Sequence, residues 1–183
     1  MTSLLRFEEV ALRRGGRLLF EELEFTLGAG EALQVTGPNG SGKSSLIRLA
    51  AGLLRPQHGR VERSPLALAD DNLARDADLP LGRALSFWGG DVPRAIEALG
   101  IAHLAEVPVR LLSSGQAKRA ALARVVASGA PLWLLDEPLN ALDGDGAERV
   151  GQIIADHLRN GGAILAASHQ PLPSEPPRLE LGA

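Results

Sequence analysis

The stretch from Gly37 to Ser45 constrains the fold of this chain more than any other. It reads Gly-Pro-Asn-Gly-Ser-Gly-Lys-Ser-Ser and matches G-x-x-x-x-G-K-[ST], the loop that wraps the phosphates of a nucleoside triphosphate. Residues 31–36 alternate in polarity and predict a strand, and residues 45–51 carry an apolar stripe that predicts a helix. Backbone N–H groups and the helix dipole then favour polyanions in one concavity. The alternative, a glycine turn that merely ends a strand, is disfavoured because the strand, the glycine loop, the Lys-Ser pair and the helix occur together.

The residues of this loop have separate expected tasks. Gly37, Gly40 and Gly42 allow backbone angles and a close phosphate approach that a Cβ would block. Lys43 is expected to reach the β- and γ-phosphates, and the Ser44 hydroxyl is expected to bind Mg²⁺. The predicted nucleotide-binding residues of the loop are Gly37, Pro38, Asn39, Gly40, Ser41, Gly42, Lys43, Ser44 and Ser45.

The overall composition limits the remaining possibilities. A chain of 183 residues is long enough for one domain with a substantial core, and a net charge of −3 gives no general attraction to nucleic acid or anionic lipid. The absence of cysteine excludes disulfides and thiolate metal sites and suits a reducing cytoplasm. Arg6, Glu8 and Glu9 interrupt any apolar N-terminal run, so we expect no signal peptide. Apolar runs stay far below the roughly 20 residues that span a bilayer, so another polypeptide would supply any membrane part.

Most of the chain is patterned as an α/β core. A hairpin-like turn at 13–17 separates two strand-like runs, and Pro131–Leu135 is a continuous apolar run typical of a central parallel strand. A helix is expected over Ala147–Arg159, ended by Asn160-Gly161-Gly162. The predicted strands are 4–10, 18–27, 31–36, 60–63, 66–69, 131–135, 163–167 and 178–181.

From Asn72 to about Ser128 the composition shifts to alanine, leucine and arginine, which indicates a helical lobe inserted into that core. Phe87 and Trp88 are interpreted as core of this lobe; the alternative is that one ring anchors a partner interface. The predicted helices of the lobe are 81–88, 92–99 and 115–127. The expected organisation is one domain over 1–183, with the α/β core at 1–71 and 129–183 and the helical lobe at 72–128.

Carboxylates and a histidine follow two of the buried strands. Asp136 and Glu137 come directly after an apolar strand, at the sheet edge where ligands of parallel α/β folds bind. Asp136 is the natural second ligand for Mg²⁺, and Glu137 is placed to act as general base on an attacking water. His169 ends the next apolar strand and could donate to the γ-phosphate while it aligns the water and the glutamate. An isolated Asp-Glu pair would be read as a solvated turn; beside this loop that reading is improbable.

A second candidate anion site precedes the helix predicted at 115–127. Leu112-Ser113-Ser114-Gly115-Gln116 places small and polar residues at a helix N-terminus. Alone, Ser-Ser-Gly marks a turn or an N-cap. In sequence order with the other motifs it becomes informative.

Taken together, these motifs resemble the ATP-binding cassette (ABC) ATPase family over nearly the whole chain. The matching elements, in family order, are the loop Gly37–Ser45, the signature Leu112–Gln116, the acidic strand end Leu132–Pro138, the loop Asn140–Asp143 and the switch histidine His169. The resemblance implies an α/β fold: a P-loop NTPase core with a mostly parallel sheet, an antiparallel β subdomain and an inserted helical lobe. It also implies ATP and Mg²⁺ as cofactors, with Lys43, Glu137 and His169 as catalytic residues.

The family resemblance further implies a head-to-tail dimer that ATP holds together. Each ATP would lie between the phosphate loop of one subunit and the signature of the other, with Asp143 working across the interface. Hydrolysis would then release the dimer, a population shift driven by contacts made in only one state. The residues assigned to the partner's nucleotide are Ser113, Ser114, Gly115 and Gln116.

Within that family the chain is most similar to the ATPase subunits of the bacterial haem-export and cytochrome c maturation system. The stretches that carry this likeness are Arg14–Arg17, Gly30–Val35, Pro108–Arg110 and Leu132–Leu139. The likeness implies integral membrane permease subunits as partners, a peripheral position on the cytoplasmic face of the bacterial inner membrane, and hydrolysis linked to release of a haem-loaded chaperone. Without cysteine, the chain has no C-x-x-C-H motif and is not expected to hold haem covalently.

Three positions depart from the usual family pattern. Arg14 occupies the place where many members stack an aromatic ring on adenine, and a guanidinium can also stack on a flat ring. Asp71 stands where a glutamine usually contacts Mg²⁺ and the membrane partner, and a carboxylate there can still bind the metal. Ser114 replaces the first glycine of the signature, a small change.

Other functions remain as alternatives. The chain could be the ATPase subunit of another small ABC exporter, or a soluble ABC protein acting on nucleic acid or the ribosome. Relatives of the soluble kind carry two fused cassettes or long coiled-coil insertions, which this chain lacks. A nucleotide-binding scaffold without turnover is disfavoured by Glu137 and His169 together. A GTPase is disfavoured because the Asn-Lys-x-Asp motif is missing.

Overall fold

The phosphate loop follows one strand of a five-stranded sheet, at the edge formed by the C-terminal ends of the strands. In the computed structural model, which describes residues 3–70, 76–173 and 175–182, every neighbouring pair of this sheet is parallel. The strands in spatial order are β5 (Leu66–Ala69), β6 (Leu132–Asp136), β7 (Ala163–Ala167), β3 (Ala32–Thr36) and β8 (Arg178–Glu180). The inner strands β6 and β7 are almost wholly buried, as expected where helices cover both faces of a parallel sheet.

The side chains of β6 alternate between two separate hydrophobic cores. Leu134 packs with Leu46 and Ile47 of α1 (Lys43–Ala50), on the face that the antiparallel sheet also covers. Trp133 and Leu135 point to the other face. On that face the cluster includes residues of α4 (Ser114–Ser128) and α5 (Gly144–Arg159). The sheet is therefore the middle layer. It packs against α1, which follows the phosphate loop, on one face and against α4, which carries the signature, on the other.

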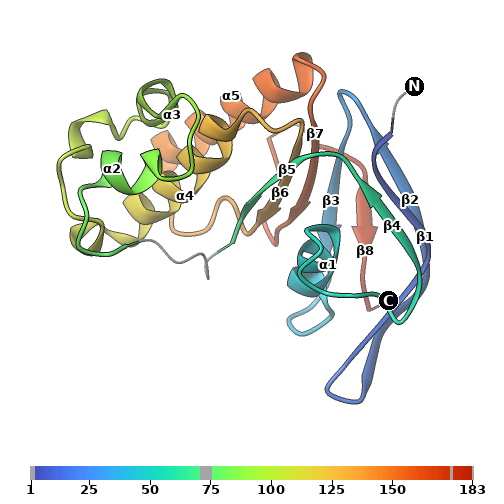
Figure 1. Cartoon of the computed structure of the whole chain (residues 1–183). Coiled ribbons are helices and arrows are strands. Elements are labelled where there is room, and N and C mark those ends of the chain that lie inside the picture. The colour runs from blue at the N-terminus through green and yellow to red at the C-terminus, as the bar shows by residue number, and fades with distance from the viewer. Residues whose placement is uncertain (1–2, 71–75, 174, 183) are drawn as a thin grey trace.

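A three-stranded antiparallel sheet forms the second layer. It has the order β2 (Arg17–Gly28), β1 (Ser3–Arg14) and β4 (His58–Arg63). Arg14 pairs with Arg17, and Gly15 and Gly16 both have positive φ, which is the geometry of a tight two-residue hairpin. The sequence prediction of a hairpin turn here is confirmed. Figure 1 shows this sheet on the opposite side of the molecule from the helices α2, α3 and α4.

The remaining helices gather beyond β5 and β6 (Figure 1). They are α2 (Leu81–Ser86), α3 (Val92–Ala98) and the short 3₁₀ turns η1 (Ala102–Leu104) and η2 (Val109–Leu111), together with α4. Within the described ranges, no helix is both long and apolar enough to cross a bilayer. The structure confirms the predicted combination of a mostly parallel sheet, an antiparallel β subdomain and an inserted group of helices.

The interpretation of Phe87 and Trp88 as core is wrong. The side chain of Phe87 is 82% exposed and Trp88 is 48% exposed. The physical reason is that α2 ends at Ser86, and Gly89 and Gly90 follow with positive φ, so the two rings leave the helix face buried by the preceding turn. Trp88 instead lies under the guanidinium of Arg124, 4.9 Å from the ring centroid. The exposure of the two rings agrees with the alternative, in which one ring anchors a partner interface.

His157 of α5 is half-buried against the core residue Trp133. Its imidazole stacks on Trp133 with ring centroids 3.7 Å apart. Burial away from water lowers the pKa of His157, because desolvation penalises the charged form.

Candidate nucleotide site

The phosphate loop joins the end of β3 to the start of α1 and has the backbone conformation that its glycines predict. Gly37, Gly40 and Gly42 all have positive φ. A Cβ added at Gly37 would lie 2.3 Å from the carbonyl oxygen of Leu181, so only glycine fits there. Gly42 is the N-cap of α1, so the free N–H groups of the first helical turn face the loop. This is the concavity expected of a phosphate cradle.

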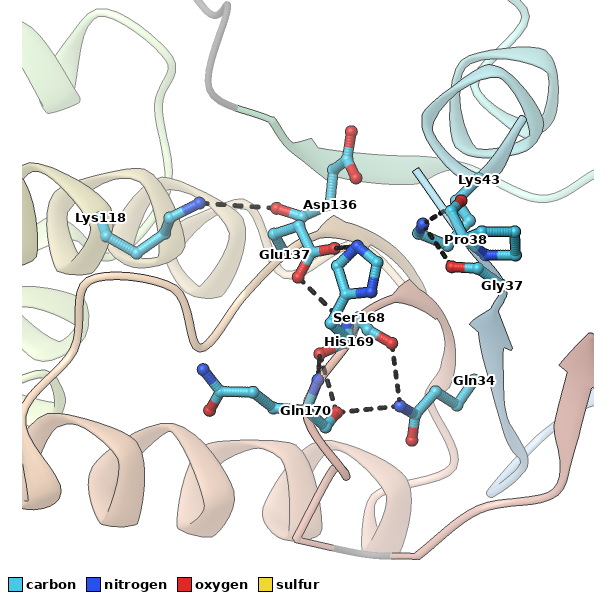
Figure 2. A network of polar contacts seen from close by, with 10 residues as sticks. All are labelled: Gln34, Gly37, Pro38, Lys43, Lys118, Asp136, Glu137, Ser168, His169 and Gln170. Carbon is cyan, nitrogen blue, oxygen red and sulfur yellow. Dashed lines mark hydrogen bonds and ion pairs between the residues drawn. The ribbon is translucent and has the colours of Figure 1, made fainter. Parts of the chain in front are cut away.

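Lys43 lies across this loop. Its side chain is almost fully buried, and Nζ donates hydrogen bonds to the carbonyl oxygens of Gly37 (2.8 Å) and Pro38 (3.0 Å). Figure 2 shows these two bonds. A buried ammonium needs such partners, because desolvation without them is costly. The carbonyls therefore hold one positive charge at the mouth of the loop, where phosphate oxygens would meet it.

A cavity of about 760 Å³ opens beside the loop, which is within the roughly 300–1,000 Å³ of typical ligand pockets. It brings together the hairpin between β1 and β2, the phosphate loop and the ends of β6 and β7. The lining residues are Arg14, Gly15, Leu19, Asn39, Gly40, Gly42, Lys43, Ser44, Ser45, Glu137, Asn140 and His169. Glycine N–H groups, hydroxyls and two cationic side chains are the chemistry that suits a triphosphate.

Arg14 reaches this cavity from the antiparallel sheet. Its Nη1 donates to the hydroxyl of Ser45 in α1 at 3.3 Å, so the hairpin and the phosphate loop are joined at the cavity wall. The guanidinium is thereby held where a flat base could lie against it.

Glu137 and His169 face each other across the ends of β6 and β7 (Figure 2). The backbone N–H of His169 donates to one carboxylate oxygen of Glu137 at 3.3 Å, and imidazole Nε2 lies 3.5 Å from the other. Glu137 has a positive φ of 49°, uncommon for a residue with a Cβ, while its own N–H donates to the carbonyl of Ala167 at 2.8 Å. The next strand thus holds Glu137 in a strained conformation that turns its side chain to the cavity.

Of the three residues predicted to bind Mg²⁺, Ser44 and Asp136 lie in the described part of the chain. Ser44 lines the cavity, and Asp136 ends β6, where the Nζ of Lys118 donates to its backbone carbonyl at 3.5 Å. Asp71 falls outside the described residues. Over 3–70, 76–173 and 175–182 no group of three or more His, Cys, Asp or Glu side chains could hold a metal. A hydroxyl and a carboxylate are nonetheless ligands suited to a magnesium ion shared with phosphate oxygens.

The signature residues lie elsewhere, at the N-terminus of α4. Ser113 and Gln116 form a reciprocal capping box: Gln116 N–H donates to Ser113 Oγ at 3.3 Å, and Ser113 N–H donates to Gln116 Oε1 at 2.9 Å. A Cβ at Gly115 would lie 2.7 Å from the carbonyl oxygen of Ala141. Asp143 caps α5 by accepting from the N–H of Gly146 at 2.8 Å. The described lining of the cavity includes none of the predicted signature residues, nor Asp143.

Three polar residues at or near the site were given no role of their own from the sequence, although Asn140 begins the loop Asn140–Asp143 that was matched to the family. Asn140 lines the cavity, Lys118 reaches Asp136, and Gln34 of β3 bonds to the segment that carries His169. Asn140 follows the acidic strand end closely, which is a usable signal. Gln34 and Lys118 are polar residues in buried elements, and a buried polar side chain has a partner by default.

The chain is similar to proteins of a known family. The family model described as ABC transporter matches residues 20–140. The "Cytochrome c biogenesis ATP-binding export protein CcmA" of Sphingopyxis alaskensis is 55% identical, with 92% of this chain and 91% of that protein covered. The protein of the same name from Novosphingobium aromaticivorans is also 55% identical, covering 91% and 89%.

A solved structure described as the ATP binding subunit of an ABC transporter superposes with a TM-score of 0.87 over 97% of this chain and 85% of that chain. At 19% identity this likeness concerns the fold alone. The 55% identity to the two export proteins over about nine tenths of the chain, by contrast, shows membership of their family. The chain therefore belongs to the ABC transporter family, among the cytochrome c biogenesis ATP-binding export proteins.

Proposed function

We propose that this chain is the ATP-hydrolysing subunit of a membrane ABC complex that serves haem export in cytochrome c biogenesis, where hydrolysis releases a haem-loaded chaperone. The single observation that carries the proposal is the convergence of Lys43, Glu137 and His169 on one cavity in a chain so similar to the export proteins named above. The mechanism below follows from the contacts of these residues.

Nucleotide binding is assigned to the phosphate loop and the hairpin. The loop N–H groups and the dipole of α1 face the phosphates, and Lys43 exchanges its bonds to the Gly37 and Pro38 carbonyls for bonds to phosphate oxygens. Arg14, which lines the same cavity, stacks on the base. Ser44 and Asp136 would hold Mg²⁺, which would supply positive charge to offset that of the phosphates.

Hydrolysis is assigned to Glu137 and His169. The carboxylate of Glu137 is held at the cavity edge by the backbone N–H of His169, and it accepts a proton from the attacking water as general base. The imidazole of His169 lies on the same carboxylate and donates toward the γ-phosphate, which keeps water and base in line. Both residues come from strand ends, so their spacing is set by the pairing of β6 with β7.

The second half of each site is assigned to another copy of the cassette. The signature residues Ser113 to Gln116 lie apart from the cavity of their own chain, so they contact the nucleotide of a head-to-tail partner. ATP then joins the two copies, and its hydrolysis releases them. Asp143 stands at the start of α5 beside the signature and acts across the same interface.

The membrane partner is assigned to multi-spanning permease subunits, with this chain on the cytoplasmic face of the bacterial inner membrane. Phe87 and Trp88, exposed side by side at the end of α2, are the proposed contact of the helical region with that partner. Aromatic side chains supply much of the energy of protein interfaces.

Two measurements test this function. Purification of the full chain from its native membrane should bring down a multi-spanning membrane protein and a haem-handling protein. Steady-state phosphate release from ATP should be detectable in the same preparation. Phosphate release in a preparation that brings down no membrane protein would favour a soluble ABC protein, and nucleotide binding without phosphate release would favour a scaffold.

A further inference from the structure

The side chain of Gln34 is buried, and both ends of its amide hydrogen-bond to backbone groups of the protein. Gln34 lies in the middle of β3, three residues before the phosphate loop, and is 2% exposed. Its Nε2 donates to the carbonyl oxygens of Ser168 (3.2 Å) and Gln170 (2.9 Å), and its Oε1 accepts from the N–H of Leu172 (3.2 Å). Figure 2 shows the amide reaching both carbonyls. Two acceptors on one side and a donor on the other fix the orientation of the amide.

The three partners of Gln34 surround His169 in the sequence. They belong to residues 168–172, which follow β7 and contain the imidazole that faces Glu137. The same segment is folded on itself, because Ser168 Oγ donates to the carbonyl of Gln170 (2.8 Å) and accepts from its N–H (3.1 Å). Gln34 therefore holds a preformed turn by its backbone, leaving the side chain of His169 free to face the cavity.

His169 makes its contacts to Glu137 from this turn. Its N–H and its imidazole reach the two oxygens of one carboxylate, so a small rotation of the turn would lengthen both contacts together. Gln34 acts on the turn from β3, the strand that continues into Gly37 and Lys43. The side chain of Gln34 thus fixes residues 168–172, called the switch turn below, relative to the phosphate loop.

We propose that Gln34 is a positioning residue for hydrolysis, which holds His169 and through it Glu137 at a fixed place over the phosphate loop. The inference rests on the proposed roles of Glu137 and His169. Gln34 itself is buried and is not part of the described lining of the cavity. Misplacing a catalytic group by about 1 Å can cost on the order of 100-fold in rate, so a lost anchor should appear in kcat and leave nucleotide binding nearly intact.

The test is a double-mutant cycle on the full chain with Gln34→Met and His169→Ala. Methionine keeps the length and the apolar packing of the side chain but supplies neither donor nor acceptor of comparable strength. We expect Gln34→Met to lower kcat by about tenfold, with the KM for ATP within about twofold. In the His169→Ala background the same change should lower kcat by less than about twofold, because the group it positions is gone.

Thr36→Val is the matched control. Thr36 lies on the same strand, and its hydroxyl donates to the carbonyl of Leu179 in β8, away from the switch turn. We expect kcat within about twofold of the parent. Hydrogen exchange gives a readout independent of activity: the N–H groups of His169 and Leu172 should exchange at least about tenfold faster in Gln34→Met and at the parent rate in Thr36→Val. If Gln34→Met fails to fold, Gln34→Asn, one methylene shorter, replaces it.

Equal loss of kcat from Gln34→Met in the parent and His169→Ala backgrounds would overturn the inference, since the effect would not pass through His169. So would unchanged exchange at His169 and Leu172. A His169→Ala chain with the parent kcat would contradict the proposed function itself. The two failures are therefore distinguishable.

Discussion

The cavity around Lys43 and the N-terminus of α4 lie in one chain, yet their polar side chains are used in opposite ways. At the cavity, Lys43, Glu137 and His169 come from three elements and converge on a common space. At α4, Ser113 bonds to its own helix through Gln116, and nearby Asp143 caps α5. The first group lines a cavity while it bonds within the chain, whereas the second group caps helices and lies outside the described lining of that cavity. The proposed function assigns the cavity to the nucleotide of its own chain and the signature to the nucleotide of a partner.

Lys43→Ala is the change with the largest expected effect and tests the first region. It removes the charge that the loop carbonyls hold at the phosphate position. We expect phosphate release to fall by at least about 100-fold and nucleotide binding to weaken in the same chain. Phosphate release and equilibrium binding of ATP measure the two effects. Binding and turnover at the parent level would show that this cavity is not the nucleotide site.

Glu137→Gln separates binding from chemistry within the cavity. The amide keeps the size of the side chain but cannot accept a proton from water, so we expect kcat to fall by about 100-fold or more with ATP binding retained. Because nucleotide then persists, dimers should accumulate in the presence of ATP. Sedimentation with and without ATP measures this. A variant that stays monomeric with ATP bound would remove the basis for the dimer.

Ser113→Ala sharpens the contrast at the other region. Loss of the cap should lower the free energy of unfolding by about 1 kcal/mol. Asp91→Ala is the matched control, because Asp91 caps α3 in the same helical region by accepting from the N–H of Arg94 at 3.2 Å. Both variants should lose similar stability in denaturant titrations. Only Ser113→Ala should also reduce phosphate release; equal activity in the two would leave Ser113 with a capping role alone.

Phe87→Ala is expected to have the smallest effect on the chain itself. A side chain 82% exposed contributes little to folding, so the free energy of unfolding should change by less than about 0.5 kcal/mol. Phosphate release by the isolated chain should also be unchanged. Co-purification of a membrane subunit should fall, because the proposed contact loses a ring. Full retention of that subunit would place the contact elsewhere.

The parts of the fold that the sequence predicts well are those with local signals. The phosphate loop is set by its own glycines, and the strand at 163–167 is set by an unbroken apolar run that the structure reproduces as β7. The buried strand ends then place Glu137 beside His169, because neighbouring parallel strands end at one edge. The loop and the strand need only residues close together in the chain, whereas the meeting of Glu137 and His169 also needs β6 and β7 to be neighbours.

The parts that were missed depend on tertiary context. Phe87 and Trp88 continue a helical period, but the helix stops at Ser86. Gly89 and Gly90 then redirect the chain toward the end of α4, where the N–H of Asp91 donates to the carbonyl of Ala127. Gln34 fits an alternating strand, where a polar residue is expected to face water. Its burial follows from the sheet order, in which β7 and β8 flank β3 on both sides. That order cannot be read from the residues of β3 alone.

The most direct test of the central claim mixes two inactive variants of the full chain. Lys43→Ala keeps an intact Ser113, and Ser113→Arg keeps an intact Lys43, so a head-to-tail mixed dimer contains one complete site. With random pairing, about a quarter of the parent sites should be restored, and phosphate release should rise well above that of either variant alone. A mixture no more active than its separate components would contradict a nucleotide site shared between two copies.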